Sequence, residues 1–155
     1  MKLRTIESKD NCAVKTLIQT SLESFGLDIP GTAYFDPQLA DLTSYYAAES
    51  AAYWVVEEDG NILACGGYGP FKGDGNICEL QKLYVAEQAQ GKGLSKLLMD
   101  QILLAAKDHY QHIYLETTSK LEVANILYQK YQFHKLDQPL PGSEHAMDVW
   151  YLRDL

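Results

Sequence analysis

The 155-residue chain lacks the features that mark several protein classes. Its three cysteines, Cys12, Cys65 and Cys78, are widely spaced and form no CxxC pair, so we expect no structural zinc site and a reduced, intracellular protein. No apolar run approaches the roughly 18 residues that a membrane helix needs. The opening MKLRTIESKD has no apolar signal-peptide segment. We therefore expect a cytoplasmic protein with no membrane partner.

Positive charge is also scarce. Lys and Arg number 13 against 21 Asp and Glu, which gives a formal net charge of −8. A nucleic-acid binder usually carries a basic stripe, so we expect no nucleic-acid partner. Hydrophobic residues make up 46% and charged residues 22%, close to globular averages. The length predicts one domain over residues 1–155.

Hydrophobic periodicity predicts alternating strands and helices, which indicates an α/β layered domain. Asp59-Gly60 is a hairpin signal, and Ser119 with Glu122 has the spacing of a helix capping box. The expected strands cover 2–6, 52–58, 61–68, 77–85, 112–116, 133–136 and 147–153, and the expected helices 10–25, 36–46, 94–107 and 119–131.

The expected strand over 77–85 changes the parity of its apolar positions. Cys78 and Leu80 are apolar at even positions, whereas Leu83 and Val85 are apolar at odd positions. A regular strand keeps one parity, so either both faces are buried or a β-bulge inserts one residue near 81–83. Bulges often lie beside active sites.

The loop that follows this strand could bind an anion. Gly91 and Gly93 allow close approach to the backbone, and the next helix begins with unpartnered amides and a positive dipole end. Lys92 and Lys96 add positive charge. Lys96 occupies the third glycine position of a dinucleotide fingerprint, and no P-loop pattern is present. An ordinary strand-to-helix turn explains the same residues.

Three segments together resemble the GNAT superfamily of N-acetyltransferases. Residues 88–93 fit the family signature [QR]-x-x-G-x-[GA], and 79–85 are similar to its bulged fourth strand. Residues 124–133 resemble A-N-x-x-Y-x-K-x-G-F, although Gln132 stands where the family often has glycine. The resemblance covers about residues 50–155.

The resemblance implies a mixed α/β sheet of seven strands flanked by helices, with a bulged central strand. It also implies acetyl-CoA as co-substrate and no metal, with the pyrophosphate on the 88–94 amides. Homodimers are common in the family, but no sequence feature here establishes one. The expected coenzyme-binding residues are Leu83, Tyr84, Val85, Gln88, Gln90, Gly91, Lys92, Gly93, Leu94, Ser95 and Asn125.

Acetyl transfer to an amine requires a neutral amine and a protonated leaving thiolate. A lysine-like amine has a pKa near 10.4, and its neutralisation at pH 7 costs about 4 to 5 kcal/mol. Glu79 is our first candidate base, with Glu116 or a water as alternatives. A glutamate on a solvated strand face, with no catalytic role, would give the same sequence pattern. Tyr128 lies one helical turn from Asn125 and could protonate the thiolate, or be a buried structural aromatic.

The acceptor is predicted only as a small-molecule or peptide amine, and the net charge mildly favours a cationic one. An acetyl-CoA-binding sensor without catalysis and an interaction module are the alternatives. We expect the four histidines, including His145, at the surface or at strand ends. Four aromatic residues could wall the acceptor pocket or simply pack helices: Tyr34, Phe35, Tyr45 and Tyr46.

Overall fold

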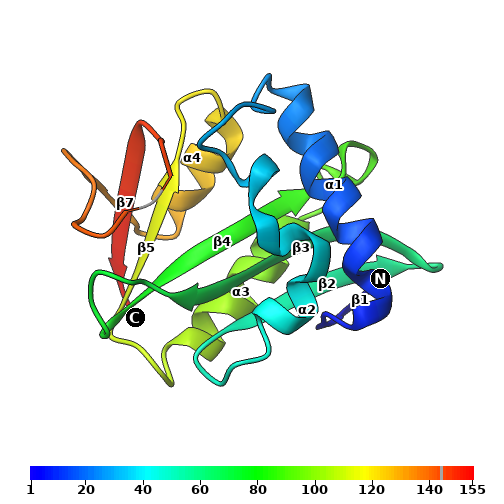
Figure 1. Ribbon diagram of the computed structural model, residues 1–155, viewed down its shortest axis with the longest axis horizontal. Helices are drawn as coiled ribbons and strands as arrows, with labels where there is room; N and C mark the ends of the chain where they lie inside the picture. Colours follow the sequence, from blue (N-terminus) through cyan, green and yellow to red (C-terminus); the bar gives the residue numbers. More distant parts are fainter. Residues whose placement is uncertain (144) are drawn as a thin grey trace.

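The computed structural model describes residues 1–143 and 145–155, and its strands form one mixed sheet (Figure 1). Within these residues the sheet has seven strands in the order β1-β2-β3-β4-β5-β7-β6. Neighbouring strands are antiparallel except β4 and β5, which are parallel. The strands are β1 (Lys2–Thr5), β2 (Ala52–Glu58), β3 (Asn61–Pro70), β4 (Ile77–Val85), β5 (His112–Thr117), β6 (His134–Leu136) and β7 (Val149–Asp154).

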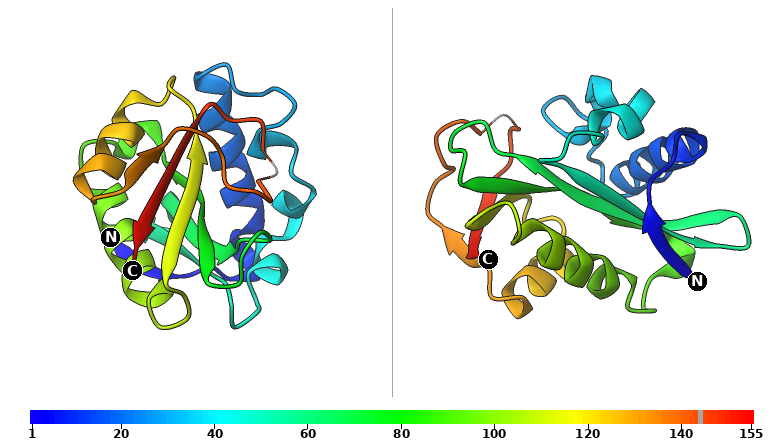
Figure 2. Two further views of the ribbon diagram at one scale, coloured as in Figure 1. Left: turned by 90° about the vertical axis from the view of Figure 1, so that its left-hand side faces the viewer. Right: turned by 90° about the horizontal axis from the view of Figure 1, so that it is seen from below.

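Helices cover both faces of this sheet. Figure 2 shows α1 and α2 on one face and α3 and α4 on the other. Each face has its own core because each long helix carries one apolar stripe, such as Val14, Ile18 and Leu22 on α1. The predicted α/β fold is therefore confirmed. The helices are α1 (Asn11–Ser24), α2 (Leu42–Tyr45), α3 (Leu94–Ala106) and α4 (Glu122–Lys130), with short 3-10 turns at η1 (Ser8–Asp10), η2 (Ala33–Phe35), η3 (Pro37–Asp41) and η4 (Glu87–Ala89).

Two predicted helix starts are wrong in detail. The helix expected over 36–46 is the 3-10 turn η3 followed by α2, and Asp41 caps α2 by accepting from the Ser44 amide at 3.2 Å. The predicted capping box does not form, because the Ser119 hydroxyl donates instead to Asp148 at 3.1 Å. As a result α4 begins only at Glu122.

The predicted bulge in β4 is confirmed. Cys65 pairs with Tyr84 and Gly67 pairs with Gln81, so the two residues Lys82 and Leu83 lie opposite Gly66 alone. Lys82 adopts a φ of 52°, and its carbonyl accepts a hydrogen bond from the Tyr53 hydroxyl at 2.7 Å. The extra residue turns Leu83 onto the face that Leu80 occupies, which explains the change of parity.

The two parallel strands, β4 and β5, separate before β4 reaches its bulge. Pairing between β4 and β5 runs only from Ile77↔His112 to Glu79↔Tyr114. After Glu79, β4 continues to Val85 and β5 continues to Thr117 without further pairing to each other. The sheet therefore opens between them, as Figure 1 shows.

No helix in the described part of the chain has the length and apolar character to cross a bilayer.

Candidate active site

A cleft of about 1040 Å³ occupies the opening between β4 and β5. The second half of β4 and the end of β5 line its middle. The segment from η4 to the start of α3 lines one part, and the first turns of α4 line another. Residues of α1 and of the loops before η2 and β7 complete the wall. The cleft is thus built where the sheet loses its internal pairing.

One part of the cleft is suited to bind an anion. Gly91 and Gly93 have φ values of 79° and 78°, in the left-handed region that favours glycine. Gly93 is the N-cap of α3, and the first helical bond runs from the Leu97 amide to the Gly93 carbonyl at 3.1 Å. The amides of residues 94–96 precede that bond and have no acceptor within the helix. Together with the helix dipole they form a candidate anion site.

Nine of the eleven predicted coenzyme-binding residues line this cleft. They are Leu83, Tyr84, Val85, Gln88, Gln90, Gly91, Gly93, Leu94 and Ser95.

The other two, Lys92 and Asn125, do not line it. Lys92 is exposed on the loop. The Asn125 amide donates to the carbonyls of Thr118 at 3.0 Å and Leu121 at 2.8 Å, and its oxygen accepts from the Tyr151 hydroxyl at 2.8 Å. Both of its N–H donors are therefore used inside the protein. Asn125 thus fixes the start of α4 against β7.

Glu79 lies at the point where β4 and β5 part, and it lines the cleft. Its Oε1 accepts a hydrogen bond from Gln81 Nε2 at 2.7 Å. Burial raises the pKa of Glu79; the Gln81 bond lowers it in part, and the nearby Glu116 carboxylate raises it further. The net effect is a pKa above the ordinary value, which suits a group that takes up protons near neutral pH.

Glu116 also lines the cleft, from the β5 side. Both of its carboxylate oxygens are shielded from solvent. It lies two residues beyond Tyr114, the β5 residue that pairs with Glu79. Two carboxylates from neighbouring strands therefore meet where the sheet opens.

Tyr128 lines the cleft from α4 and is 7% exposed. Its ring packs against Phe133 and Tyr151, with centroid distances of 5.9 and 5.7 Å. Among the described residues none forms a hydrogen bond with the Tyr128 hydroxyl. Burial raises the pKa of Tyr128, so the phenol stays protonated at neutral pH. The hydroxyl is thus a proton donor without a partner in the described chain.

A polar bridge beside Glu79 was missed by the sequence analysis. Lys82 Nζ lies 2.9 Å from Asp36 Oδ2, and His145 Nε2 lies 3.2 Å from Asp36 Oδ1. The Lys82 side chain is only 4% exposed. The bridge joins the β4 bulge to two loops that come from distant parts of the sequence.

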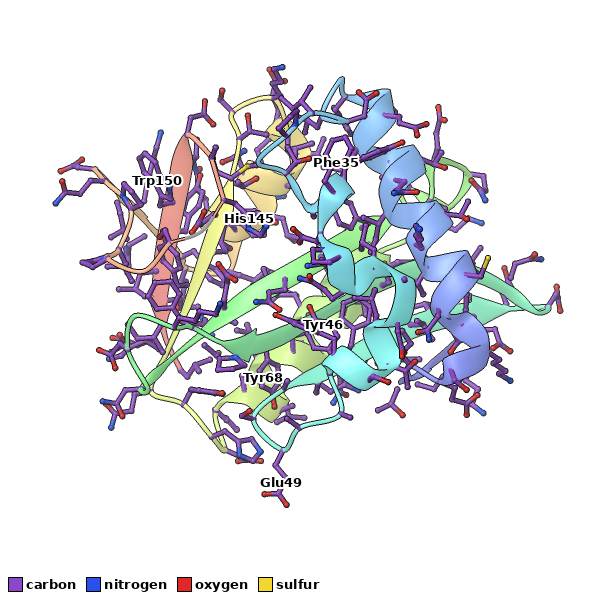
Figure 3. The ribbon with its side chains drawn as sticks, in the orientation of Figure 1. Phe35, Tyr46, Glu49, Tyr68, His145 and Trp150 are labelled. Carbon is purple, nitrogen blue, oxygen red and sulfur yellow. The ribbon has the colours of Figure 1, made fainter. Side chains whose placement is uncertain are left out.

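The expectation that His145 is a surface or strand-end residue is wrong, because it is half-buried and lines the cleft (Figure 3). Its hydrogen bond with Asp36 raises the pKa of His145 against the opposing effect of burial. The Ala146 amide donates to the Gly31 carbonyl at 3.2 Å, which joins the loop before β7 also to the loop before η2. No spacing rule connects these residues, so the sequence carried no signal for them.

The four aromatic residues expected at the acceptor pocket do not line the cleft. Phe35 and Tyr45 are exposed. The Tyr34 hydroxyl donates to Glu23 at the surface at 2.7 Å. Tyr46 is buried in the core of the α1 face, so the alternative interpretation as a packing residue is the correct one for it.

These observations define a class of α/β protein whose split sheet contains a cleft, with a candidate anion site beside groups that could transfer protons. The sequence profile described as "Acetyltransferase (GNAT) domain" matches residues 49–135. An Escherichia coli (strain K12) protein named "Uncharacterized N-acetyltransferase YjgM" is 35% identical over 157 residues, covering 99% of this chain and 94% of the relative.

Solved structures have the same fold. A GNAT-family acetyltransferase from Staphylococcus aureus Mu50 superposes with a TM-score of 0.84 at 19% identity, covering 99% of this chain and 98% of that one. A phosphinothricin acetyltransferase from Sinorhizobium meliloti, in complex with AcCoA, has a TM-score of 0.75 at 17% identity, covering 99% and 88%. The chain belongs to the GNAT family of acetyltransferases and is an acetyl-transferring enzyme.

Proposed function

We propose that this enzyme moves an acetyl group from acetyl-CoA directly to a primary amine, with Glu79 as the base and Tyr128 as the acid. The observation that carries the proposal is that both side chains line the one cleft at the opening of the sheet. One is a carboxylate with a raised pKa, and the other is a protonated phenol with no partner among the described residues. These are the two proton-transfer groups that the reaction requires.

The residues of the cleft fit acetyl-CoA. The amides at the start of α3, framed by Gly91 and Gly93, suit a pyrophosphate. Beyond Glu79 the β5-facing edge of β4 has no strand partner, so Leu83 and Val85 can offer main-chain hydrogen bonds to an extended pantetheine arm. The coenzyme supplies a thioester that an amine nitrogen can attack, breaking the carbon–sulfur bond.

Glu79 is proposed to take the proton of the incoming ammonium group, directly or through one water. Glu116 adds a second negative charge close to it, and burial of the Glu116 oxygens strengthens its field. Two adjacent carboxylates favour a cationic acceptor, in line with the net charge of −8. The acceptor is therefore a small-molecule or peptide amine that arrives protonated.

Tyr128 is proposed to give its hydroxyl proton to the departing thiolate. The amine nitrogen loses its second proton to solvent as the amide forms, solvent returns a proton to the phenolate, and Glu79 releases to solvent the proton it took up, so the enzyme ends the cycle unchanged with one net proton released. Its packing against Phe133 and Tyr151 fixes the ring in place. Positioned general acids typically contribute about 10² to 10⁴-fold in rate.

The proposal is tested by free-thiol release from acetyl-CoA against a panel of polyamines, amino acids and lysine peptides. With the best acceptor, Glu79→Gln should lower the rate about 10²-fold or more at pH 7. The rate should partly recover near pH 10, where the free amine is abundant. A proportional loss at every pH would assign Glu79 to acceptor binding instead. Binding of acetyl-CoA with no thiol release for any acceptor would indicate a sensor.

A further inference from the structure

A chain of three side chains leads from the core of the α1 face to the candidate base. The Tyr46 hydroxyl donates to Gln81 Oε1 at 2.7 Å, and Gln81 Nε2 donates to Glu79 Oε1 at 2.7 Å. Glu79 and Gln81 are two residues apart on β4 before the bulge, so they share one face of the strand. The chain therefore connects a buried phenol to the proton-accepting carboxylate.

The surroundings of Gln81 leave room for its amide and support the residue that holds it. Gly69 on β3 pairs with Glu79 on β4. Because Gly69 has no side chain, the Gln81 amide fits beside it: a Cβ at Gly69 would lie only 3.0 Å from Gln81 Oε1. Tyr46 is stacked on Tyr53 with ring centroids 4.7 Å apart (Figure 3 labels Tyr46). The Tyr53 hydroxyl in turn holds the carbonyl of the bulge residue. The bulge and the amide are thus anchored by one aromatic pair.

Hydrogen-bonding capacity fixes which way the amide points. An ionised carboxylate can only accept, so the NH₂ group of Gln81 must face Glu79. Its oxygen then faces Tyr46, whose hydroxyl donates. Glu79 Oε1 is occupied in this arrangement, whereas Oε2 makes no hydrogen bond to a described residue and is not sealed from solvent. Oε2 is the oxygen left to receive a proton.

We propose that Gln81 is a positioning residue for the base: it holds Glu79 by one oxygen so that the other is presented to the acceptor, and Tyr46 orients the Gln81 amide. This inference rests on the proposed role of Glu79. It goes beyond that role because it assigns a task to two residues that have none in the proposed function.

Removal of the Gln81 bond should raise the pKa of Glu79, because that bond opposes the effect of burial. The groups of neighbouring elements that act on this carboxylate are unchanged by the substitution. They are Glu116 and Tyr114 on β5, Lys82 on β4, His145 in the loop before β7 and Tyr46 at the C-cap of α2.

The test compares Gln81→Met, Tyr46→Phe and the wild type by a ¹³C NMR titration of glutamate carboxylates, with the Glu79 signal assigned from Glu79→Gln. We expect the pKa of Glu79 to rise by about one unit in Gln81→Met, the effect of one lost hydrogen bond to a charged group, and by less in Tyr46→Phe. Tyr34→Phe is the matched control, because its hydroxyl contacts Glu23 at the surface. It should leave the titration unchanged.

Kinetics separate positioning from mere packing. The acidic limb of the pH profile for kcat/KM should move to higher pH with the Glu79 pKa in Gln81→Met, giving a roughly tenfold loss below the limb. The positioning role is overturned if the pKa of Glu79 in Gln81→Met stays at the wild-type value. It is also overturned if kcat/KM of this variant falls by the same factor at every pH. If Gln81→Met does not fold, the same criteria apply to Tyr46→Phe. If Glu79→Gln keeps the wild-type acidic limb, the base assignment itself fails.

Discussion

Replacement of Tyr128 by phenylalanine removes one hydroxyl and keeps the ring. The ring contacts with Phe133 and Tyr151 are retained, and no hydrogen bond to a described residue is lost. The free energy of unfolding should therefore change by less than about 1 kcal/mol. Acetyl-CoA affinity should stay within a few fold, because the α3 amides and the β4 edge are untouched.

Turnover should behave differently from stability. Loss of a general acid should lower the chemical step by about 10²-fold or more, equivalent to roughly 2.7 kcal/mol of transition-state stabilisation. Single-turnover mixing with the best acceptor measures that step even where product release limits the steady state. Calorimetry and thermal unfolding measure affinity and stability on the same samples.

Tyr151→Phe is the matched control from the same aromatic cluster. The Tyr151 hydroxyl donates to Asn125 Oδ1 at 2.8 Å, and its side chain is 1% exposed. Its removal leaves a part-buried acceptor unpaired and should destabilise the protein by about 1 kcal/mol. Tyr151→Phe should slow the chemical step less than Tyr128→Phe does. A Tyr128→Phe enzyme with wild-type single-turnover rates would refute the acid assignment.

Two further predictions concern the anion site and the polar bridge. Gly93→Ala should weaken acetyl-CoA binding in calorimetry, whereas Gly60→Ala should not. The two glycines are matched, because their positive φ values are nearly equal (78° and 79°) and neither has an atom within 4 Å of an added Cβ. Equal losses of acetyl-CoA affinity in the two variants would show that backbone strain alone is responsible. Because Asp36 raises the pKa of His145, the protonated imidazole stabilises the fold below its ordinary pKa of 6.5, and this contribution is lost as pH rises through the folded value. His145→Gln should therefore lower the free energy of unfolding more at about pH 6 than at about pH 8.5 in denaturant titrations, and an equal effect at both would contradict the linkage.

Local sequence signals predicted much of the scaffold. The bounds of β2 and β4 are as expected, and the parity change in β4 located the bulge within two residues. The glycines before α3 indicated the anion site because a left-handed backbone conformation strongly favours glycine. Each of these signals lies within one short segment, where the physical cause and the residue pattern coincide.

The side-chain network around Glu79 could not be predicted, since it is made across the fold. Asp36 meets Lys82 and His145, which are 46 and 109 residues away in sequence. Asn125 shows the same limit in another way: its position in the motif was identified, but its partner Tyr151 comes from a strand 26 residues later. Tertiary contacts of this kind determine which of two plausible roles a residue takes.

The split between β4 and β5 has a consequence for aggregation. Unpaired strand edges can pair with strands of other chains, and proteins usually shorten, charge or cover such edges. Here the two unpaired edges belong to β4 and β5 and face each other inside one sheet. On its other side β4 pairs with β3, and β5 pairs with β7. Residues of α1 and α4 line the opening on either side. A slender extended ligand could reach the unpaired peptide groups in this opening, while a second sheet has no flat border to join there, so these two inner edges present a smaller risk of association with other chains than the outer edges at β1 and β6.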